Sequence, residues 1–176
     1  MSNTFLYFAY GSNLLAKRIR LNNPTAVMRD IGYIKNFRLD FQRYSKRWHG
    51  ASATIVETND TIVWGVVWEL DKCNLSTLDC QEGVQDNIYH AMSVNVETPN
   101  GTTLNCRVYQ QCHNPTEYII PVDLPVDRRP SPLYLEMIIK GAQDNNLPNY
   151  YISFLKSIPD NEYKGEYDIS LSLIED

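Results

Sequence analysis

Strand-like apolar runs dominate the first two thirds of this chain, and helical periodicity dominates the remainder. Residues 5–10 read as a buried strand, and residues 26–44 indicate one or two strands with little clean alternation. Residues 52–57 and 61–69 predict a hairpin that turns at Asn59-Asp60. The second strand of that hairpin is apolar almost throughout, which indicates a strand covered on both faces.

Further strands and helices follow in the middle of the chain. Residues 71–80 predict a short helix, with Gly83 just past its end. Residues 87–97 and 102–109 alternate well and predict two strands joined by a turn at Pro99-Asn100-Gly101. These strands continue the β-rich pattern of the first half.

Three helix starts can be read from local signals. Asn13 is expected to cap a short helix that Pro24 ends. Ser131-Pro132 combines a cap with a first-turn proline, so a helix should run from there to about Asn145. A second helix is expected over residues 148–157.

The fold class follows from the order of these elements. About six or seven strands precede three or four helices, which is an α+β pattern built around a small barrel or strongly curled sheet. Residues 113–130 are rich in proline and lack periodicity. A linker between domains would explain them, but a long functional loop is favoured in so short a chain. We therefore expect residues 1–176 to form a single domain.

Composition and charge exclude several classes of function. Hydrophobic residues make up 43% and charged residues 21%, as in ordinary globular proteins, and the net charge of −5 argues against nucleic-acid binding. No run is long enough to span a membrane, and the N-terminus lacks the pattern of a signal peptide. The four scattered cysteines suit a reducing cytosol, and with three histidines they show no metal-ligand spacing. The sequence therefore indicates a cytoplasmic protein without membrane or nucleic-acid partners and without a metal site.

The segment Gly11-Ser12-Asn13 connects an apolar strand to a helical pattern. Such a junction offers unpaired backbone N–H groups that suit an anion or a developing oxyanion, although a tight turn capped by asparagine explains it equally well. The spacing of a phosphate loop is missing, and so is the Gly-x-Ser-x-Gly of a nucleophile elbow. Ser12 is therefore not expected to act as a covalent nucleophile.

Glu82 is the carboxylate best placed for acid/base work. A lone glutamate near a helix end is by default a solvated surface group. Here it precedes Gly83 and lies between an apolar helix and an alternating strand, so backbone can approach its ligand closely. Judged alone, Tyr109 and Tyr134 fit the core or an interface. A solvated face is the interpretation for the basic residues Arg43, Lys46 and Arg47.

Several motifs occur together in one order: residues 7–14 (Tyr-Phe-Ala-Tyr-Gly-Ser-Asn-Leu), 63–68 (Val-Trp-Gly-Val-Val-Trp), 81–84 (Gln-Glu-Gly-Val), Ser131-Pro132 and Leu147-Pro148. In this combination the chain resembles the γ-glutamylcyclotransferase family, from about Phe5 to Tyr163. The γ-glutamylamine-directed branch typically reads Tyr-Gly-Thr-Leu and the glutathione-specific branch Tyr-Gly-Ser-Leu. The Tyr-Gly-Ser-Asn-Leu of this chain favours the branch that acts on γ-glutamyl amino acids.

The resemblance implies a fold, an activity and a set of site residues. The implied fold is a small mixed β-barrel with peripheral helices, and the implied activity forms 5-oxoproline and a free amino acid from a γ-glutamyl amino acid. Glu82 would be the catalytic general acid/base, Tyr134 would contact substrate, and Tyr109 would lie near the site. The expected substrate-binding loop comprises Tyr7, Phe8, Ala9, Tyr10, Gly11 and Ser12.

The implied partner is a small-molecule γ-glutamyl amino acid, and a homodimer is left open. No cofactor is expected, because the substrate's own α-amine is the nucleophile. Residues 113–130 look longer than the connection usual in the family, so they are expected to overhang the pocket. Two rival interpretations remain: the same chemistry on glutathione or a γ-glutamylamine, and a catalytically silent module that only binds γ-glutamyl compounds.

Overall fold

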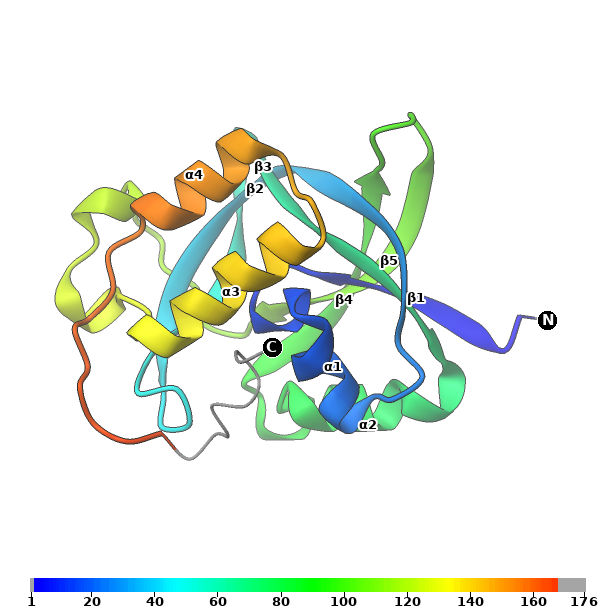
Figure 1. The fold of residues 1–176 in the computed structure, drawn as a ribbon, viewed down its shortest axis with the longest axis horizontal. Helices are drawn as coiled ribbons and strands as arrows, with labels where there is room; N and C mark the ends of the chain where they lie inside the picture. The colour runs from blue at the N-terminus through cyan, green and yellow to red at the C-terminus, as the bar shows by residue number, and fades with distance from the viewer. Residues whose placement is uncertain (1, 168–176) are drawn as a thin grey trace.

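The computed structural model describes residues 2–167, and this part contains five β-strands and four α-helices (Figure 1). The strands are β1 (Thr4–Ala9), β2 (Val27–Ser45), β3 (Gly50–Asp71), β4 (Tyr89–Glu97) and β5 (Thr103–Gln111). The helices are α1 (Ala16–Asn22), α2 (Leu75–Gln81), α3 (Pro132–Asp144) and α4 (Asn149–Ser157). A 3-10 turn, η1 (Ser12–Leu14), separates β1 from α1.

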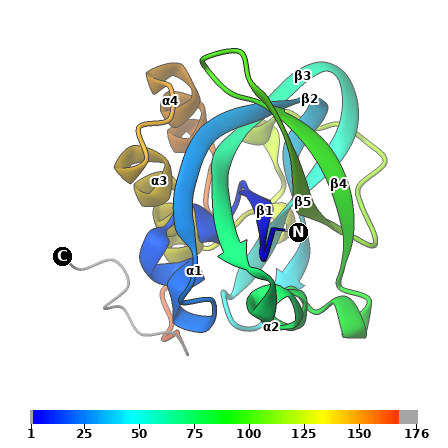
Figure 2. The ribbon, with the colours of Figure 1, turned by 90° about the vertical axis from the view of Figure 1, so that its right-hand side faces the viewer.

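The five strands close into a barrel in the order β1-β3-β2-β4-β5 (Figure 2). Neighbouring strands run antiparallel except β1 and β5, which pair in parallel where Tyr7 faces Arg107. This mixed barrel with peripheral helices confirms the predicted α+β fold class. The parallel seam also brings the junction after β1 next to β5.

The strand pattern differs from the expected one in β3. β3 is a single continuous strand, so the predicted hairpin at Asn59-Asp60 is wrong and the strand count is lower than expected. β2 pairs with both halves of β3, and the register shifts between Lys35 and Phe37. Asn36 and Asp60 both have positive φ there (62° and 61°), and the Asp60 N–H donates to Asn36 Oδ1 at 3.2 Å. These turn-favouring residues therefore bend the paired strands as a bulge instead of reversing the chain.

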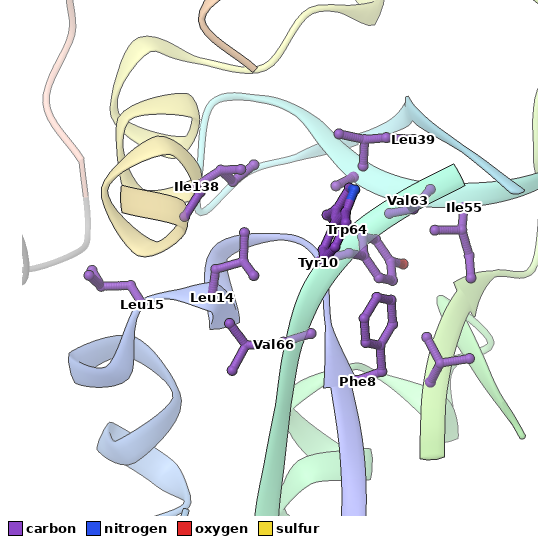
Figure 3. Packing of buried hydrophobic residues seen from close by; sticks show 14 of the residues in the cluster. Phe8, Tyr10, Leu14, Leu15, Leu39, Ile55, Val63, Trp64, Val66 and Ile138 are labelled. Carbon is purple, nitrogen blue, oxygen red and sulfur yellow. The ribbon is translucent and has the colours of Figure 1, made fainter. Parts of the chain in front are cut away.

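The apolar second half of β3, residues 63–70, is covered on both faces, as its composition predicted. Figure 3 shows Val66 beside Leu14 and Ile138 on the side of β3 that faces α3, and Phe8 and Tyr10 on the other side. All five side chains are at most 7% exposed. Burial on both faces stabilises the fold by roughly 25 cal/mol for each Å² of apolar surface removed from water.

The two helices that follow the barrel begin and end close to the predicted residues. Ser131 Oγ accepts the Tyr134 N–H at 3.4 Å, and Pro132 occupies the first turn of α3. α3, α4 and α1 lie on one side of the barrel, and α2 lies below the strands beside the end of α1 (Figures 1 and 2). None of the described helices is long and apolar enough to cross a membrane.

The proline-rich segment 113–130 is part of the barrel's packing and not a linker. Arg128 Nη2 forms an ion pair with Asp40 Oδ1 at 2.7 Å, and the Ala51 N–H donates to the Arg129 carbonyl at 3.0 Å. The expectation that this segment overhangs the pocket is wrong. None of its residues lines the recess or the cavity described below, because these contacts hold it against β2 and β3.

Candidate active site

A narrow recess lies where β1 leads into η1, beside the C-terminal end of α2. It is lined by Tyr7, Tyr10, Gly11, Ser12, Asn13, Ala53, Glu82, Tyr89, Tyr109 and Tyr134. The fold thus brings together Glu82, the two predicted site tyrosines Tyr109 and Tyr134, and four of the six residues of the predicted substrate-binding loop. Glu82 is the one carboxylate among these tyrosine-rich walls.

Glu82 is positioned by the way α2 ends. Its N–H donates to the Leu78 carbonyl at 3.0 Å, so its backbone belongs to the last turn of the helix. Gly83 follows with a φ of 67°, the left-handed conformation that ends many helices. A Cβ at Gly83 would also lie 2.8 Å from Ile88 Cδ1. Glycine therefore stops α2 directly after the carboxylate and fixes where the carboxylate lies.

Asn13 holds the Glu82 carboxylate and does not cap a helix, so that prediction is wrong. α1 begins after Leu15, without a side-chain cap. The buried Asn13 side chain donates from Nδ2 to Glu82 Oε1 and to Tyr7 Oη, each at 3.1 Å. Its Oδ1 accepts from Gln81 Nε2 at 3.1 Å. Asn13 is therefore clamped by α2 and presents a donor to the carboxylate.

The pKa of Glu82 is raised from an ordinary value of 4.5 to about 7. Burial is the main cause, because it disfavours the charged form. The charge of Arg18 and the hydrogen bond from Asn13 oppose this rise, and the nearby negative charge of Asp79 adds to it. A carboxyl with this pKa can both accept and release a proton near neutral pH.

Tyr134 reaches the recess from the first turn of α3. Its hydroxyl oxygen accepts the Ala53 N–H at 3.0 Å, and its ring lies 4.9 Å from the Trp48 ring. A Cβ at Gly11 would lie 3.4 Å from the same hydroxyl, so glycine leaves room for this approach. Burial raises the pKa of Tyr134 well above its ordinary value. The phenol therefore keeps its proton, which remains available to a ligand.

Tyr109 belongs to a polar cluster in the wall of the recess. Its hydroxyl donates to Asp79 Oδ1, and Arg107 binds both oxygens of Asp79 at 2.8 Å. Burial is the main reason why the pKa of Tyr109 is raised. Its ring packs edge-on against Tyr7, with centroids 5.7 Å apart. The proton of Tyr109 is thus already used within the protein, in contrast to that of Tyr134.

Two residues of the predicted binding loop do not line the recess. Phe8 and Ala9 are fully buried in the barrel core. A Cβ at Gly65 would lie 2.2 Å from the Ala9 carbonyl and 2.7 Å from the Phe8 ring. These two residues therefore do not line the recess: they pack β1 against β3, and the loop reaches the recess through Tyr7 and residues 10–12.

A wider cavity of about 560 Å³ adjoins the recess and shares Ser12, Glu82, Tyr89 and Tyr134 with it. The basic residues Arg43, Lys46 and Arg47 are exposed, as predicted, but they stand at the rim of this cavity. Arg18 lies in its wall with only 6% of its surface exposed. The turn between β2 and β3 thus forms one side of the site.

Sequence reasoning missed several residues that build this site. Asn13, Tyr89 and Arg18 face it, and Asp79 holds Tyr109. Asp79 lies one helical turn before Glu82, which is a spacing that places both on one face of α2. The other three carry no local signal, since their partners lie far away in the sequence. Within residues 2–167, no group of three or more His, Cys, Asp or Glu side chains could hold a metal ion.

Comparisons with known proteins show the family to which the chain is related. Residues 62–155 match the model of the AIG2-like family. The γ-glutamylcyclotransferases of Mus musculus and Homo sapiens are 44% and 42% identical to this chain over 93% of its length and 83% of theirs. A solved structure of a γ-glutamyl cyclotransferase superposes with a TM-score of 0.85 at 40% identity, covering 97% of this chain and 95% of that one.

Proposed function

This chain belongs to the γ-glutamylcyclotransferases of the AIG2-like family, and from that premise we propose that it converts γ-glutamyl amino acids to 5-oxoproline and the free amino acid. The observation that carries the proposal is the partly buried Glu82, whose pKa of about 7 suits a group that must take up and return a proton. Glu82 is the general acid/base in this account.

The substrate supplies its own nucleophile in this reaction. Its α-amine attacks its γ-carbonyl carbon, so a C–N bond forms within the glutamyl group and the amide bond to the leaving amino acid breaks. The enzyme has to fold the chain into a near-attack geometry, and such orientation is worth roughly 7–11 kcal/mol in favourable cases. The narrow walls formed by Tyr7, Tyr10 and Tyr89 suit that task.

Proton transfer follows from the position and pKa of Glu82. The ionised carboxylate takes a proton from the α-nitrogen as the tetrahedral intermediate forms. The resulting carboxylic acid then donates that proton to the departing nitrogen as the amide bond breaks. The proton lost by one nitrogen is gained by the other, so Glu82 returns to its starting state after each turnover.

Binding of the oxyanion or the α-carboxylate is assigned to hydrogen-bond donors of the η1 turn and to Tyr134. The N–H groups of Ser12 and Asn13 open the η1 turn and therefore have no acceptor within it. Tyr134 lies over Gly11 and has a proton to donate. These donors would stabilise negative charge at the substrate. Tyr109 positions the wall through Asp79 and Arg107.

We also place this enzyme in the cytosol and treat residues 1–176 as one domain. All four cysteines are unpaired, which suits a reducing compartment. The strands and helices share one cluster of buried hydrophobic residues, as expected for a single folding unit.

Release of 5-oxoproline from purified protein tests the proposed function. We expect turnover of γ-glutamyl-alanine, with less from glutathione and from γ-glutamyl-ε-lysine. Greater release from either of the latter compounds would move the protein to another substrate while keeping the chemistry. If no compound releases 5-oxoproline although calorimetry shows binding, the protein is a catalytically silent binding module and the proposal is wrong.

A further inference from the structure

Glu82 lies where the recess meets the wider cavity, since both are lined by it. In the proposed function, which this inference takes as its basis, the bond that breaks must lie beside Glu82. The glutamyl group that closes into a ring then faces the tyrosine-lined recess. The leaving amino acid extends into the cavity of about 560 Å³, so that cavity meets the leaving group's own carboxylate.

Arg18 is an unusual residue in the wall of this cavity. It is 94% buried, and its Nε atom is buried without a hydrogen-bond partner. Within the described residues, no carboxylate lies within 4.0 Å of its guanidinium. Its Cζ atom lies 5.7 Å from the centre of the Trp48 ring, which holds the group in place. A buried cation with an unsatisfied donor is costly, and an anionic ligand would remove that cost.

The rest of the cavity carries the same sign of charge. Arg43, Lys46 and Arg47 stand at its rim, and the carboxylates in its lining are Glu82 and the exposed Asp86. Four basic side chains thus face two carboxylates in this lining, although the whole chain has a net charge of −5. Such a local reversal of sign attracts anions and orients them.

We propose that Arg18, assisted by Arg47 at the rim, binds the carboxylate of the leaving amino acid and selects γ-glutamyl amino acids over γ-glutamylamines. The planar guanidinium of Arg18 matches a carboxylate with two parallel hydrogen bonds. Arg47 adds a second charge from the β2–β3 turn and steers the substrate inward. The Trp48 ring, over which the Arg18 guanidinium lies, keeps the Arg18 side chain in place.

Two other roles of Arg18 make different predictions. If Arg18 only offsets the charge of Glu82, its loss should affect all substrates equally. If Arg18 binds the α-carboxylate of the glutamyl group, discrimination should depend on that carboxylate and not on the leaving group. A matched set of substrates separates the three roles.

The test compares γ-glutamyl-alanine with γ-glutamyl-alaninamide, which lacks only the leaving group's negative charge. The wild-type protein should prefer the carboxylate by about 10- to 100-fold in kcat/KM, as for a hydrogen bond to a charged group. The Arg18→Gln protein should lose at least ten-fold more activity on γ-glutamyl-alanine than on the amide. A third compound, with the α-carboxylate converted to an amide, should still show the Arg18→Gln defect.

Arg47→Gln provides a second variant that does not disturb a buried site, because Arg47 is exposed. It should reduce the same preference by a few-fold. Arg29→Gln is the matched control, since Arg29 is 60% exposed on β2 and pairs with Glu69. Thermal melting of all three variants separates a folding defect from a binding defect. Arg29→Gln should leave the ratio of the two substrates unchanged.

Equal kcat/KM for the two substrates in the wild-type protein would overturn the inference. Equal losses on both substrates in Arg18→Gln would also overturn it, and so would a defect that vanishes with the α-amide compound. If neither substrate yields 5-oxoproline, the proposed function has failed. The carboxylate preference is then measured by calorimetric binding of the same two compounds, where equal Kd values overturn it and a ten-fold preference supports it.

Discussion

Asp40 on β2 is a buried carboxylate and Glu82 at the end of α2 is a half-buried one, and their surroundings are opposite. Asp40 is 3% exposed, pairs with Arg38 Nε at 2.9 Å and Arg128 Nη2 at 2.7 Å, and accepts the Phe41 N–H at 2.8 Å. Glu82 accepts one side-chain hydrogen bond, from Asn13. Among residues 2–167, no cationic nitrogen lies within ion-pair distance of Glu82.

This difference distinguishes a carboxylate that stabilises the fold from one that is suited to proton transfer. The Asp40 cluster fixes the proline-rich segment against β2, and nearly every donor around it has an acceptor. Glu82 is half-buried and has few partners that favour its charged form, so burial raises its pKa to about 7. Stability is gained at the first site, whereas the second keeps a proton exchangeable at neutral pH.

Removing the acid/base group should give the largest effect. Glu82→Gln keeps the size and the hydrogen bond to Asn13 but cannot accept a proton, so kcat should fall about 10²–10⁴-fold. The measurement is 5-oxoproline release from γ-glutamyl-alanine. Glu136→Gln, an exposed change on α3, is the matched control and should retain activity. Near-wild-type turnover by a well-folded Glu82→Gln protein would refute the mechanism.

Replacing the structural carboxylate, Asp40, should reduce stability and leave activity in place. Asp40→Asn leaves the buried Arg38 and the half-buried Arg128 without their counter-charge, so the free energy of unfolding should fall by about 3–5 kcal/mol. Urea denaturation measures it, with the exposed Asp123→Asn as control. Activity per folded molecule should remain, since Asp40 does not line the site. A large loss of kcat without a loss of stability would mean that the two sites are not separate.

Asn13→Ala removes the hydrogen bond that the Glu82 carboxylate accepts from the Asn13 side chain. Because that bond favours the ionised form, its loss should raise the pKa of Glu82 further. Less carboxylate is then present at neutral pH, so kcat/KM at pH 7 should fall by about 10-fold, as for one hydrogen bond to a charged group. The acid limb of the pH profile should move to higher pH. The exposed Asn95→Ala should leave the profile in place.

Tyr134→Phe should have the smallest effect of the set. It removes the proton offered to the substrate and leaves the Ala53 N–H without its acceptor. One ordinary hydrogen bond corresponds to a change of about 3- to 10-fold, which should appear mainly in KM if the hydroxyl only positions substrate. A larger loss in kcat than in KM would instead assign the hydroxyl to the chemical step.

The sequence predicted those features whose causes are local. The start of α3 at Ser131-Pro132, the end of α2 at Gly83 and the apolar β3 all depend on neighbouring residues. The errors involve long-range partners. Asn13 resembled a helix cap because its position was right for one, but its acceptor lies 69 residues away on Glu82.

Asn59-Asp60 shows the same limit in the barrel. Residues that favour positive φ suit a hairpin turn and a bulge equally, and only pairing of β3 with β2 on both sides decides between them. The basic residues at 43–47 were correctly predicted to be exposed. That they border the cavity depends on how the β2–β3 turn meets α2 and Arg18, which no local pattern encodes.

The most direct measurement is the titration of the Glu82 carboxyl by NMR, with glutamate labelled with ¹³C at Cδ and the signal assigned by its loss in Glu82→Gln. We expect a midpoint near pH 7, because burial raises the pKa against the opposing effects of Arg18 and Asn13. A midpoint near 4.5, the ordinary value, would contradict it, because such a carboxylate could not hold the proton that it must return to the leaving nitrogen.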